Sequence, residues 1–496
     1  MIASEPVLRG IAANPGAPLA VLLRLLAPEA AAAWPVFVRR RFPDEFVEAV
    51  LGSPGAGVRK AIAGNPWLGD DHCLRLAGDR NELVALRLAS GRYAERRPRP
   101  LSDAVLELIH LGPAGGTEGY LTRSEIAGEL YSRGALTGSF RRRMATHPSF
   151  ELRRQACYFI DELGEAQRSA LLDDPDPEVR ATARRNHLPE VPTAEELAGA
   201  QADRERVYWY SGRPVPPELF EAAVADGHAD SLSRNRHLAP DQVRRLAAHP
   251  DPQVRRSVAG RSDLTAESAA LLAADPDPDV RLRAEVEPVP RRRAQTLVLN
   301  RVDGFAVPID HPWMFVRPVD PPALDWYLAC ARSPYPLLRR AAATCPDLDA
   351  ETVRLLAADE DREVRLLLAL YHPDAPPGLL LEAYLALPEH RLRLRLRPAF
   401  PSRRLPAELV RHDDPEVREL AAADPEFDGD PAALLADPAA DVRRAAAANP
   451  RTPAATVEAL LADPDTAPEL LEGAAAGPHL TERRLHELLD RAGVPR

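Results

Sequence analysis

The most informative segment of the chain is Ala248-His-Pro-Asp-Pro-Gln-Val-Arg-Arg-Ser-Val-Ala259, because a close copy, Ala274-Asp-Pro-Asp-Pro-Asp-Val-Arg-Leu-Arg-Ala284, follows it. The Val-Arg pairs of the two stretches lie 26 residues apart. Related Val-Arg or Leu-Arg pairs recur along the chain, at 58–59, 179–180, 338–339, 364–365, 417–418 and 442–443. A period of about 25–26 residues is typical of solenoids, in which each unit buries its apolar face on its neighbours, and not of a compact enzyme fold.

Each position of the repeat has a physical reason. In Asp174-Pro-Asp-Pro-Glu-Val-Arg180, Asp176 can cap the start of a helix, and Pro177 fits the first turn, where its missing N–H is not needed. Glu178 adds negative charge at the positive end of that helix. A second short helix is predicted in each unit, as at 240–247. Both helices are only about two turns long, so stacking on neighbouring units must stabilise them.

Asn-Pro pairs mark junctions between units, at 14–15, 65–66 and 449–450. Asparagine is suited to the left-handed conformation that often ends a helix, and a following proline prevents the helix from continuing. We therefore expect these asparagines to lie in left-handed caps.

The repeat resembles the leucine-rich repeat variant family, whose units of about this length pair an α-helix with a short 3₁₀-type helix. Its Asp-Pro…Val-Arg signature also resembles HEAT-like repeats, but those units run about 40–47 residues. The resemblance is clear over 233–285 and 323–476 and looser over 11–90 and 140–190. It implies an all-α, right-handed α-solenoid of short two-helix repeats.

The resemblance does not carry the family's cofactor. Founding members of the family hold an iron–sulfur cluster on clustered cysteines near the N-terminus, whereas Cys73 is the only cysteine in the first 150 residues of this chain. The four cysteines form no CxxC pair, and no two histidines lie three or four residues apart. Lys60, the single lysine, is not in a P-loop, and there is no GxSxG elbow. We therefore expect no catalytic residues, no metal and no cofactor.

Segments that lack the repeat of 25–26 residues divide the chain into parts. The expected parts are divergent helical repeats at 1–190, a non-repeat insert at 191–232, helical repeats at 233–285, a second insert at 286–322 and C-terminal helical repeats at 323–496. The β-prone segment Thr296–Leu299 and the turn signal Asp303-Gly304 predict that the second insert is a small β-hairpin or an ordered loop.

Aromatic residues of the inserts are the candidate binding residues, because aromatics make up only 5% of the chain and Trp, Tyr and Arg are the usual anchors of interfaces. They are Tyr208, Trp209 and Tyr210 in the first insert and Trp313 and Phe315 in the second, with Arg291, Arg292 and Arg293 at the edge of the latter. The aromatic residues have no counterpart one repeat away. We hypothesise that 286–322 contributes the main partner site; the alternative is that the rings cover the ends of interrupted helices.

The recurrent arginines are expected to form a structural ladder, in which each pairs with an aspartate of its own or the next unit. The ladder comprises Arg180, Arg255, Arg281, Arg339, Arg365, Arg418 and Arg443. The alternative is a cationic stripe for an acidic partner, which the neighbouring Asp-Pro carboxylates would largely cancel.

Two functions from different classes remain. The first is a non-enzymatic scaffold that binds a protein or peptide on the concave face and inserts of the solenoid. The alternative is an enzyme resembling the HEAT-like DNA glycosylases, or a nucleic-acid binder. The net charge of −11 counts against it, because affinity for nucleic acid comes largely from neutralising phosphates. The N-terminus does not resemble a signal peptide and no apolar run is long enough to span a bilayer, so we expect a soluble cytoplasmic protein without membrane contact.

Overall fold

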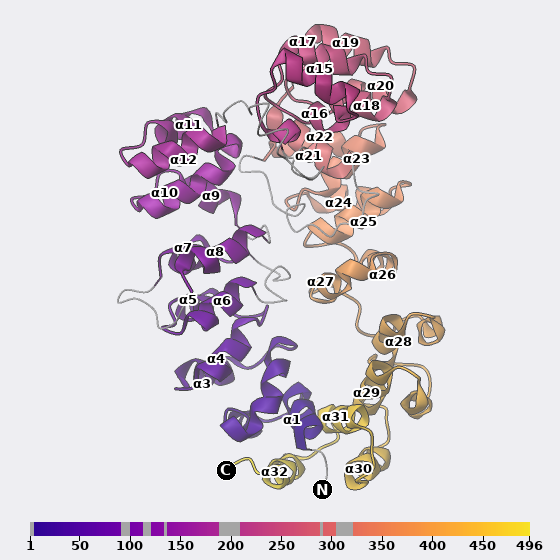
Figure 1. The fold of residues 1–496 in the computed structure, drawn as a ribbon. Coiled ribbons are helices and arrows are strands. Elements are labelled where there is room, and N and C mark those ends of the chain that lie inside the picture. Colours follow the sequence, from indigo (N-terminus) through magenta and orange to yellow (C-terminus); the bar gives the residue numbers. More distant parts are fainter. Residues whose placement is uncertain are drawn as a thin grey trace. The chain divides into compact units, whose positions relative to one another are not determined.

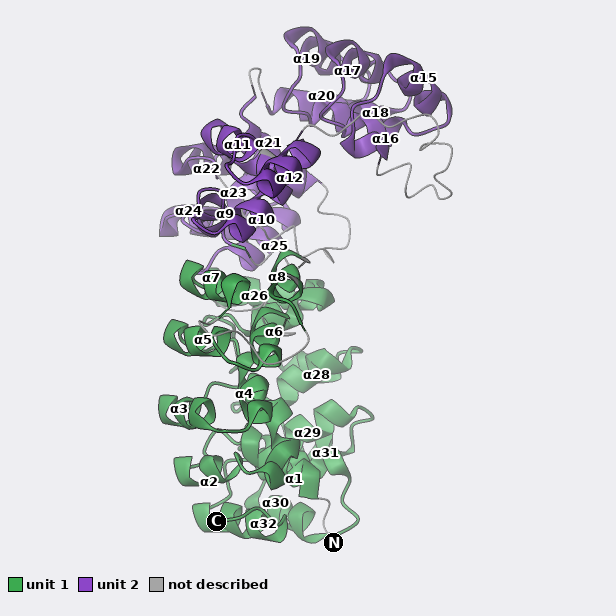
Figure 2. Cartoon of the chain, turned by 60° about the vertical axis from the view of Figure 1, so that its left-hand side comes forward, with its two compact units in different colours: residues 1–136, 311–313, 375–496 green, residues 137–310, 314–374 purple. Residues whose placement is uncertain are grey.

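The computed structural model describes residues 4–90, 100–112, 121–132, 136–187, 209–287, 291–303 and 321–496. In these ranges the regular structure is helical and there is no β-strand, so the prediction of an all-α helical repeat fold is confirmed. The chain forms two compact units, shown in Figure 2. Unit 1 comprises residues 1–136, 311–313 and 375–496, and unit 2 comprises 137–310 and 314–374.

Short helices make up both units (Figure 1). Those of unit 1 are α1 Ser4–Ala13, α2 Leu19–Arg24, η1 Pro28–Val38, α3 Asp44–Gly52, α4 Ala56–Ala63, α5 Asp70–Ala77, α6 Glu82–Ser90, α7 Asp103–Leu111, α8 Arg123–Ser132, α26 Pro377–Ala386, η5 Pro388–His390, α27 Arg391–Arg395, η6 Ala407–Arg411, α28 Pro415–Ala422, η7 Pro431–Ala436, α29 Ala440–Ala448, α30 Ala454–Ala462, α31 Pro468–Ala476 and α32 Glu482–Arg491. Those of unit 2 are α9 Gly138–Met144, α10 Phe150–Ala156, η3 Cys157–Glu162, α11 Glu165–Leu172, α12 Pro177–His187, α15 Pro217–Ala225, α16 Ala229–Ser233, α17 Pro240–Ala247, α18 Pro252–Ala259, α19 Ala266–Ala273, α20 Pro278–Glu285, α21 Arg293–Asp303, α22 Leu324–Ala331, α23 Pro336–Ala343, α24 Ala350–Ala357 and α25 Arg362–Tyr371.

A pair of helices builds each repeat, as α17 and α18 illustrate. Asp251 caps α18 by accepting a hydrogen bond of 2.8 Å from the backbone N–H of Gln253. Val254 and Val258, one turn apart on α18, are buried. The following pair, α19 and α20, begins its second helix with the equivalent cap at Asp277. Because α18 also packs on α16 and α20, successive second helices share one apolar core.

The second helices of unit 1 form a single stack that crosses the two ends of the chain. Along the sequence, α29 packs on α28, and α31 packs on α29. α1, from the other end of the sequence, then packs on α31, and η1, α4, α6 and α8 follow in order. The last repeat and the first are therefore neighbours, and both termini lie at the same end of unit 1 in Figure 1.

The contacts between the last repeat and the first reproduce those between ordinary neighbours. A Cβ on Gly473 of α31 would lie 2.7 Å from the Ala447 Cβ of α29, and a Cβ on Gly10 of α1 would lie 2.6 Å from the Ala475 Cβ of α31. In both helices glycine therefore permits a close approach of two backbones. The sequence separation differs greatly, but the packing is the same.

Junction asparagines repeat the same equivalence. Asn449 Nδ2 donates to the carbonyl oxygens of Ala422 and Asp424 in the preceding repeat, at 2.8 Å each. Asn14 Nδ2 donates in the same way to Ala475 at 3.3 Å and to Gly477 at 2.8 Å, so the first repeat has the last one as its predecessor.

The expectation that the junction asparagines adopt a left-handed conformation is wrong. Asn449 has an extended backbone with φ −64°, and Arg404 is the only non-glycine residue with positive φ in the described ranges. The asparagine is used for its side chain, which bonds the preceding repeat, and the following proline ends the helix without a left-handed cap.

Arg24 of α2 fixes the last residues of the chain to the first repeat. Its guanidinium donates to Asp490 Oδ1 and to the Val494 carbonyl, at 2.6 Å each, and its Nε donates to the Pro495 carbonyl at 3.0 Å. Arg24 is buried, so these bonds are formed away from bulk water.

The prediction of a β-hairpin at Thr296–Leu299 is wrong, because this segment lies inside α21. Thr296, Val298, Leu299 and Val302 are buried at helical spacing, and α21 packs on α23. Packing on a neighbouring helix outweighs the strand preference of the local residues. Asp303, expected at the hairpin turn, is the last residue of α21.

Residues 209–233 belong mostly to the predicted first insert, but they make the same contacts as the repeats. Asn235 Nδ2 donates to the carbonyls of Tyr210 at 2.7 Å and Arg213 at 2.6 Å, as a junction asparagine does. α16 packs on α18, so these residues extend the stack of unit 2.

Candidate interaction surface

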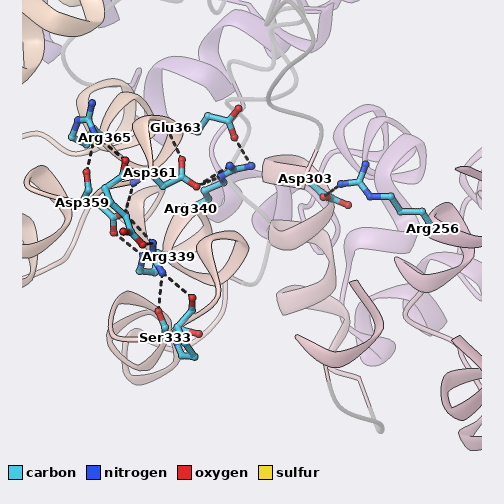
Figure 3. Close-up of polar contacts among 11 residues, drawn as sticks. Arg256, Asp303, Ser333, Arg339, Arg340, Asp359, Asp361, Glu363 and Arg365 are labelled. Atoms are coloured by element: carbon cyan, nitrogen blue, oxygen red, sulfur yellow. Dashed lines mark hydrogen bonds and ion pairs between the residues drawn. The ribbon is translucent and has the colours of Figure 1, made fainter. Parts of the chain in front are cut away.

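In several repeats an arginine of the second helix ties its repeat to the next, as Arg339 shows in Figure 3. Its Nε and Nη2 donate to the two carboxylate oxygens of Asp359, at 2.8 and 3.1 Å. Its Nη1 donates to the carbonyl of Ser333 at 3.1 Å, in the loop before its own helix. Arg365, one repeat on, donates to the Asp359 backbone carbonyl at 2.7 Å. Asp359 therefore serves two successive arginines, one through its side chain and one through its backbone.

The same two-pronged pair recurs in both units, at Arg59–Asp79, Arg153–Asp174, Arg255–Asp275 and Arg418–Asp437. Arg443 uses Glu469 instead, at the position where α31 begins. Arg180 and Arg281 have no carboxylate partner among the described residues, and they donate to the carbonyls of their own loops. The hydrogen bond from Arg255 lowers the pKa of the Asp275 carboxyl below its ordinary value. The charges of the paired arginines are therefore neutralised by carboxylates within the stack.

The aromatic candidates do not form one exposed cluster in the described residues. Tyr208, Trp313 and Phe315 lie outside the described ranges. Tyr210 is 7% exposed and belongs to the core of unit 2, with its ring centroid 5.1 Å from that of His228. A buried ring offers no surface to a partner, so the structure does not support Tyr210 as an anchor.

Trp209 is partly buried against the same core. The guanidinium of Arg213 lies 3.8 Å from its ring centroid, a cation–π contact that covers one face of the ring. Trp209 therefore has a structural partner within unit 2.

The three consecutive arginines of the second insert have different environments. The side chain of Arg291 is 1% exposed, and its Nη1 donates to the carbonyls of Ala259 and Arg261, the latter at 2.9 Å. Arg291 thus holds the preceding repeat and is not available to a partner, contrary to the hypothesis from the sequence. Arg292 and Arg293 are exposed.

A buried polar cluster fixes α21, and the sequence did not reveal it. Arg283 is 1% exposed and donates to Glu287 at 3.0 Å and to Asn300 at 2.6 Å. Nearby, Arg256 donates to Asp303 at 2.6 Å (Figure 3). The one available signal was the spacing of four residues between Arg283 and Glu287, which is common on exposed helices too.

The buried thiols show no sign of reactivity. All four cysteines are buried, and none is in a disulfide. Burial raises the pKa of Cys157 to about 11 and that of Cys330 to about 12, so neither is a thiolate near neutral pH. The described ranges contain no group of three or more His, Cys, Asp or Glu side chains arranged for a metal ion. No helix in them is long and apolar enough to cross a membrane.

The segment that contains α29 and α30 identifies the repeat. Residues 440–465 match the family model for the leucine rich repeat variant. This segment is therefore similar to a leucine rich repeat variant unit. The short helix before it, η7, is of the 3₁₀ type, as the resemblance implies. A comparison with curated proteins found no match to the chain.

The contacts of this leucine rich repeat variant unit recur in other repeats. Arg443 and, six residues later, Asn449 bond the neighbouring repeats on either side. Arg59 and Asn65 have the same spacing and make the equivalent contacts. The matched unit thus represents a geometry that is repeated in unit 1.

Proposed function

We propose that the chain is a non-enzymatic scaffold that binds a protein or peptide partner on the exposed polar surface of its stacked repeats. The proposal rests on the exposure of Arg292 and Arg293 and on their lack of partners among the described residues. Both are exposed at the start of α21, and neither side chain has an ion pair or hydrogen bond within the described residues. Arg291, directly beside them, donates to backbone carbonyls inside the stack. Trp313 and Phe315 of the same insert remain candidate anchors.

Free guanidinium groups support binding for a physical reason. Arginine is enriched in interfaces because its planar fork can make two parallel hydrogen bonds to one carboxylate. A ladder arginine such as Arg339 would have to break its existing bonds before it could contact a partner. Within the described residues, Arg292 and Arg293 have no such bonds to break.

The proposal is tested by affinity capture from an extract of the native cells, followed by quantitative mass spectrometry. The bait is the full chain, compared with Arg292→Ala/Arg293→Ala. We expect at least one protein to be enriched on the full chain and depleted on the variant. Arg354→Ala is the matched control, because Arg354 is an exposed arginine of α24 in the same unit.

Circular dichroism of all three baits establishes that the fold is intact. A set of captured proteins that is identical for the full chain and the double variant would contradict a binding role for this surface. The absence of any protein enriched over the bare matrix would contradict the scaffold itself.

A further inference from the structure

Five arginines of unit 2 lack the partners that the ladder arginines have. We call them the basic surface: Arg168 on α11, Arg184 and Arg185 at the end of α12, and Arg292 and Arg293 at the start of α21. Arg168 is half-buried and the other four are exposed. None of their side chains has an ion pair or hydrogen bond in the part of the chain that the structure describes.

Helix packing and a series of hydrogen bonds through two intervening loops link the three helices that carry the basic surface. α11 packs on α12, and the Asn186 carbonyl near the end of α12 accepts a hydrogen bond of 3.2 Å from Arg236 Nη2. The loop that contains Arg236 lies beside the next junction, because Arg261 Nη1 donates to the Asn235 carbonyl at 2.8 Å. Arg291 Nη1 donates in turn to the Arg261 carbonyl at 2.9 Å. These contacts place the start of α21 along the same edge of unit 2 as the end of α12.

The electrostatics agree with this arrangement. Burial lowers the pKa of His187, the last residue of α12, and repulsion from Arg168 and Arg293 lowers it further. Burial also lowers the pKa of Arg293, as does Arg168, while the Glu162 carboxylate opposes the shift. The arginines of α11 and α21 are therefore within electrostatic range of each other.

We propose that the basic surface binds a short acidic segment of a protein partner. This inference rests on the proposed scaffold function and specifies the chemistry of the partner. Clustered cations repel one another, and a segment rich in glutamate and aspartate would relieve that repulsion. Each guanidinium can bind a carboxylate through two parallel hydrogen bonds.

The surroundings favour an acidic peptide over a nucleic acid. Acidic side chains lie at the two junctions that these hydrogen bonds join, since Asp230 pairs with Arg234 and Asp263 pairs with Arg261, at 2.7 Å each. Asp230 and Asp263 are 52% and 45% exposed, so a long polyanion that continued along this edge would meet their carboxylates. A short segment can stay on the cations.

The test measures fluorescence anisotropy of a labelled glutamate-rich peptide with the full chain at low salt. We expect saturable binding that weakens as salt is added, and none of the same peptide with glutamine at every glutamate. The charge-reversed pairs Arg292→Glu/Arg293→Glu and Arg184→Glu/Arg185→Glu should each weaken binding about tenfold or more, a loss of about 1.4 kcal/mol. Arg354→Glu, the matched control in α24, should bind like the full chain.

Three results would overturn the inference. The glutamate peptide does not bind; the Arg354→Glu control loses as much affinity as the two pairs; or an oligothymidylate of equal charge binds more tightly than the peptide. The salt titration uses the unmodified chain, so it remains decisive if a charge reversal disturbs the fold. If extract capture depends on Arg292 and Arg293 but the acidic peptide does not bind, the scaffold proposal stands and this inference alone fails.

Discussion

Replacing Gly10 by alanine tests whether the first repeat packs on the last. The new Cβ would lie 2.6 Å from the Ala475 Cβ and would also collide with the Glu472 carbonyl oxygen, so α1 and α31 would have to separate. Overpacking of this kind costs about 1–3 kcal/mol. The better helix propensity of alanine returns up to about 1 kcal/mol. With the full propensity gain, we therefore expect the free energy of unfolding to fall by up to about 2 kcal/mol.

The assay is urea unfolding followed by circular dichroism, together with hydrogen exchange of residues 468–476. Gly473→Ala is the internal reference, because its Cβ would lie 2.7 Å from the Ala447 Cβ in an ordinary repeat contact. Gly378→Ala in α26 is the control, because its Cβ would have no neighbour within 4 Å. We expect Gly10→Ala to resemble Gly473→Ala and to speed exchange in α31. If Gly10→Ala instead behaved like Gly378→Ala, the contact between the first and last repeats would be refuted.

Further predictions concern the ladder and the thiols. Arg255→Ala should lower the free energy of unfolding by about 1–3 kcal/mol, and Arg281→Ala by less, because only Arg255 binds a carboxylate of the next repeat; equal urea midpoints would contradict this. Because the pKa of Asp275 is lowered on folding, its ionised form stabilises the fold above the unfolded value of about 3.9, and this stability is lost as pH falls through the folded value. Asp275→Asn should remove that component from an acid titration of stability, and an unchanged titration would count against the pair. Cys157 and Cys330, with pKa values of about 11 and about 12, should resist iodoacetamide near pH 8 until urea is added, and rapid native alkylation would show that they are accessible.

Local chemistry explains what the sequence predicted well. The recurring Val-Arg pair, with its capped helix start, depends on residues within one or two repeats, such as Arg255 and Asp275. Because a solenoid consists of such near-neighbour contacts, its period predicts both the helices and the type of contact between them.

The features that the sequence missed depend on distant or competing contacts. Nothing local indicates that Gly10 would pack on a helix 463 residues away, where Arg9 also pairs with Glu472. At Thr296–Leu299 the strand preference of single residues conflicted with burial against α23, and burial decided the structure. Two of the candidate binding residues, Arg291 and Tyr210, are buried. They lie in segments 286–322 and 191–232, which the sequence pattern predicts to be inserts, but the contacts of the repeats continue around them.

The continuity of the stack across the two chain ends is tested most directly by a circular permutant. Its chain would begin at Asp374 and end at Pro373, with residues 496 and 1 joined by a flexible linker of about 12 residues, which spans roughly 20 Å on average. In this order each compact unit becomes essentially one continuous segment. We expect the permutant to have the helical content and urea midpoint of the parent chain. A permutant that is unfolded, or whose urea midpoint is much lower than that of the parent chain, would contradict the contact between the first and last repeats.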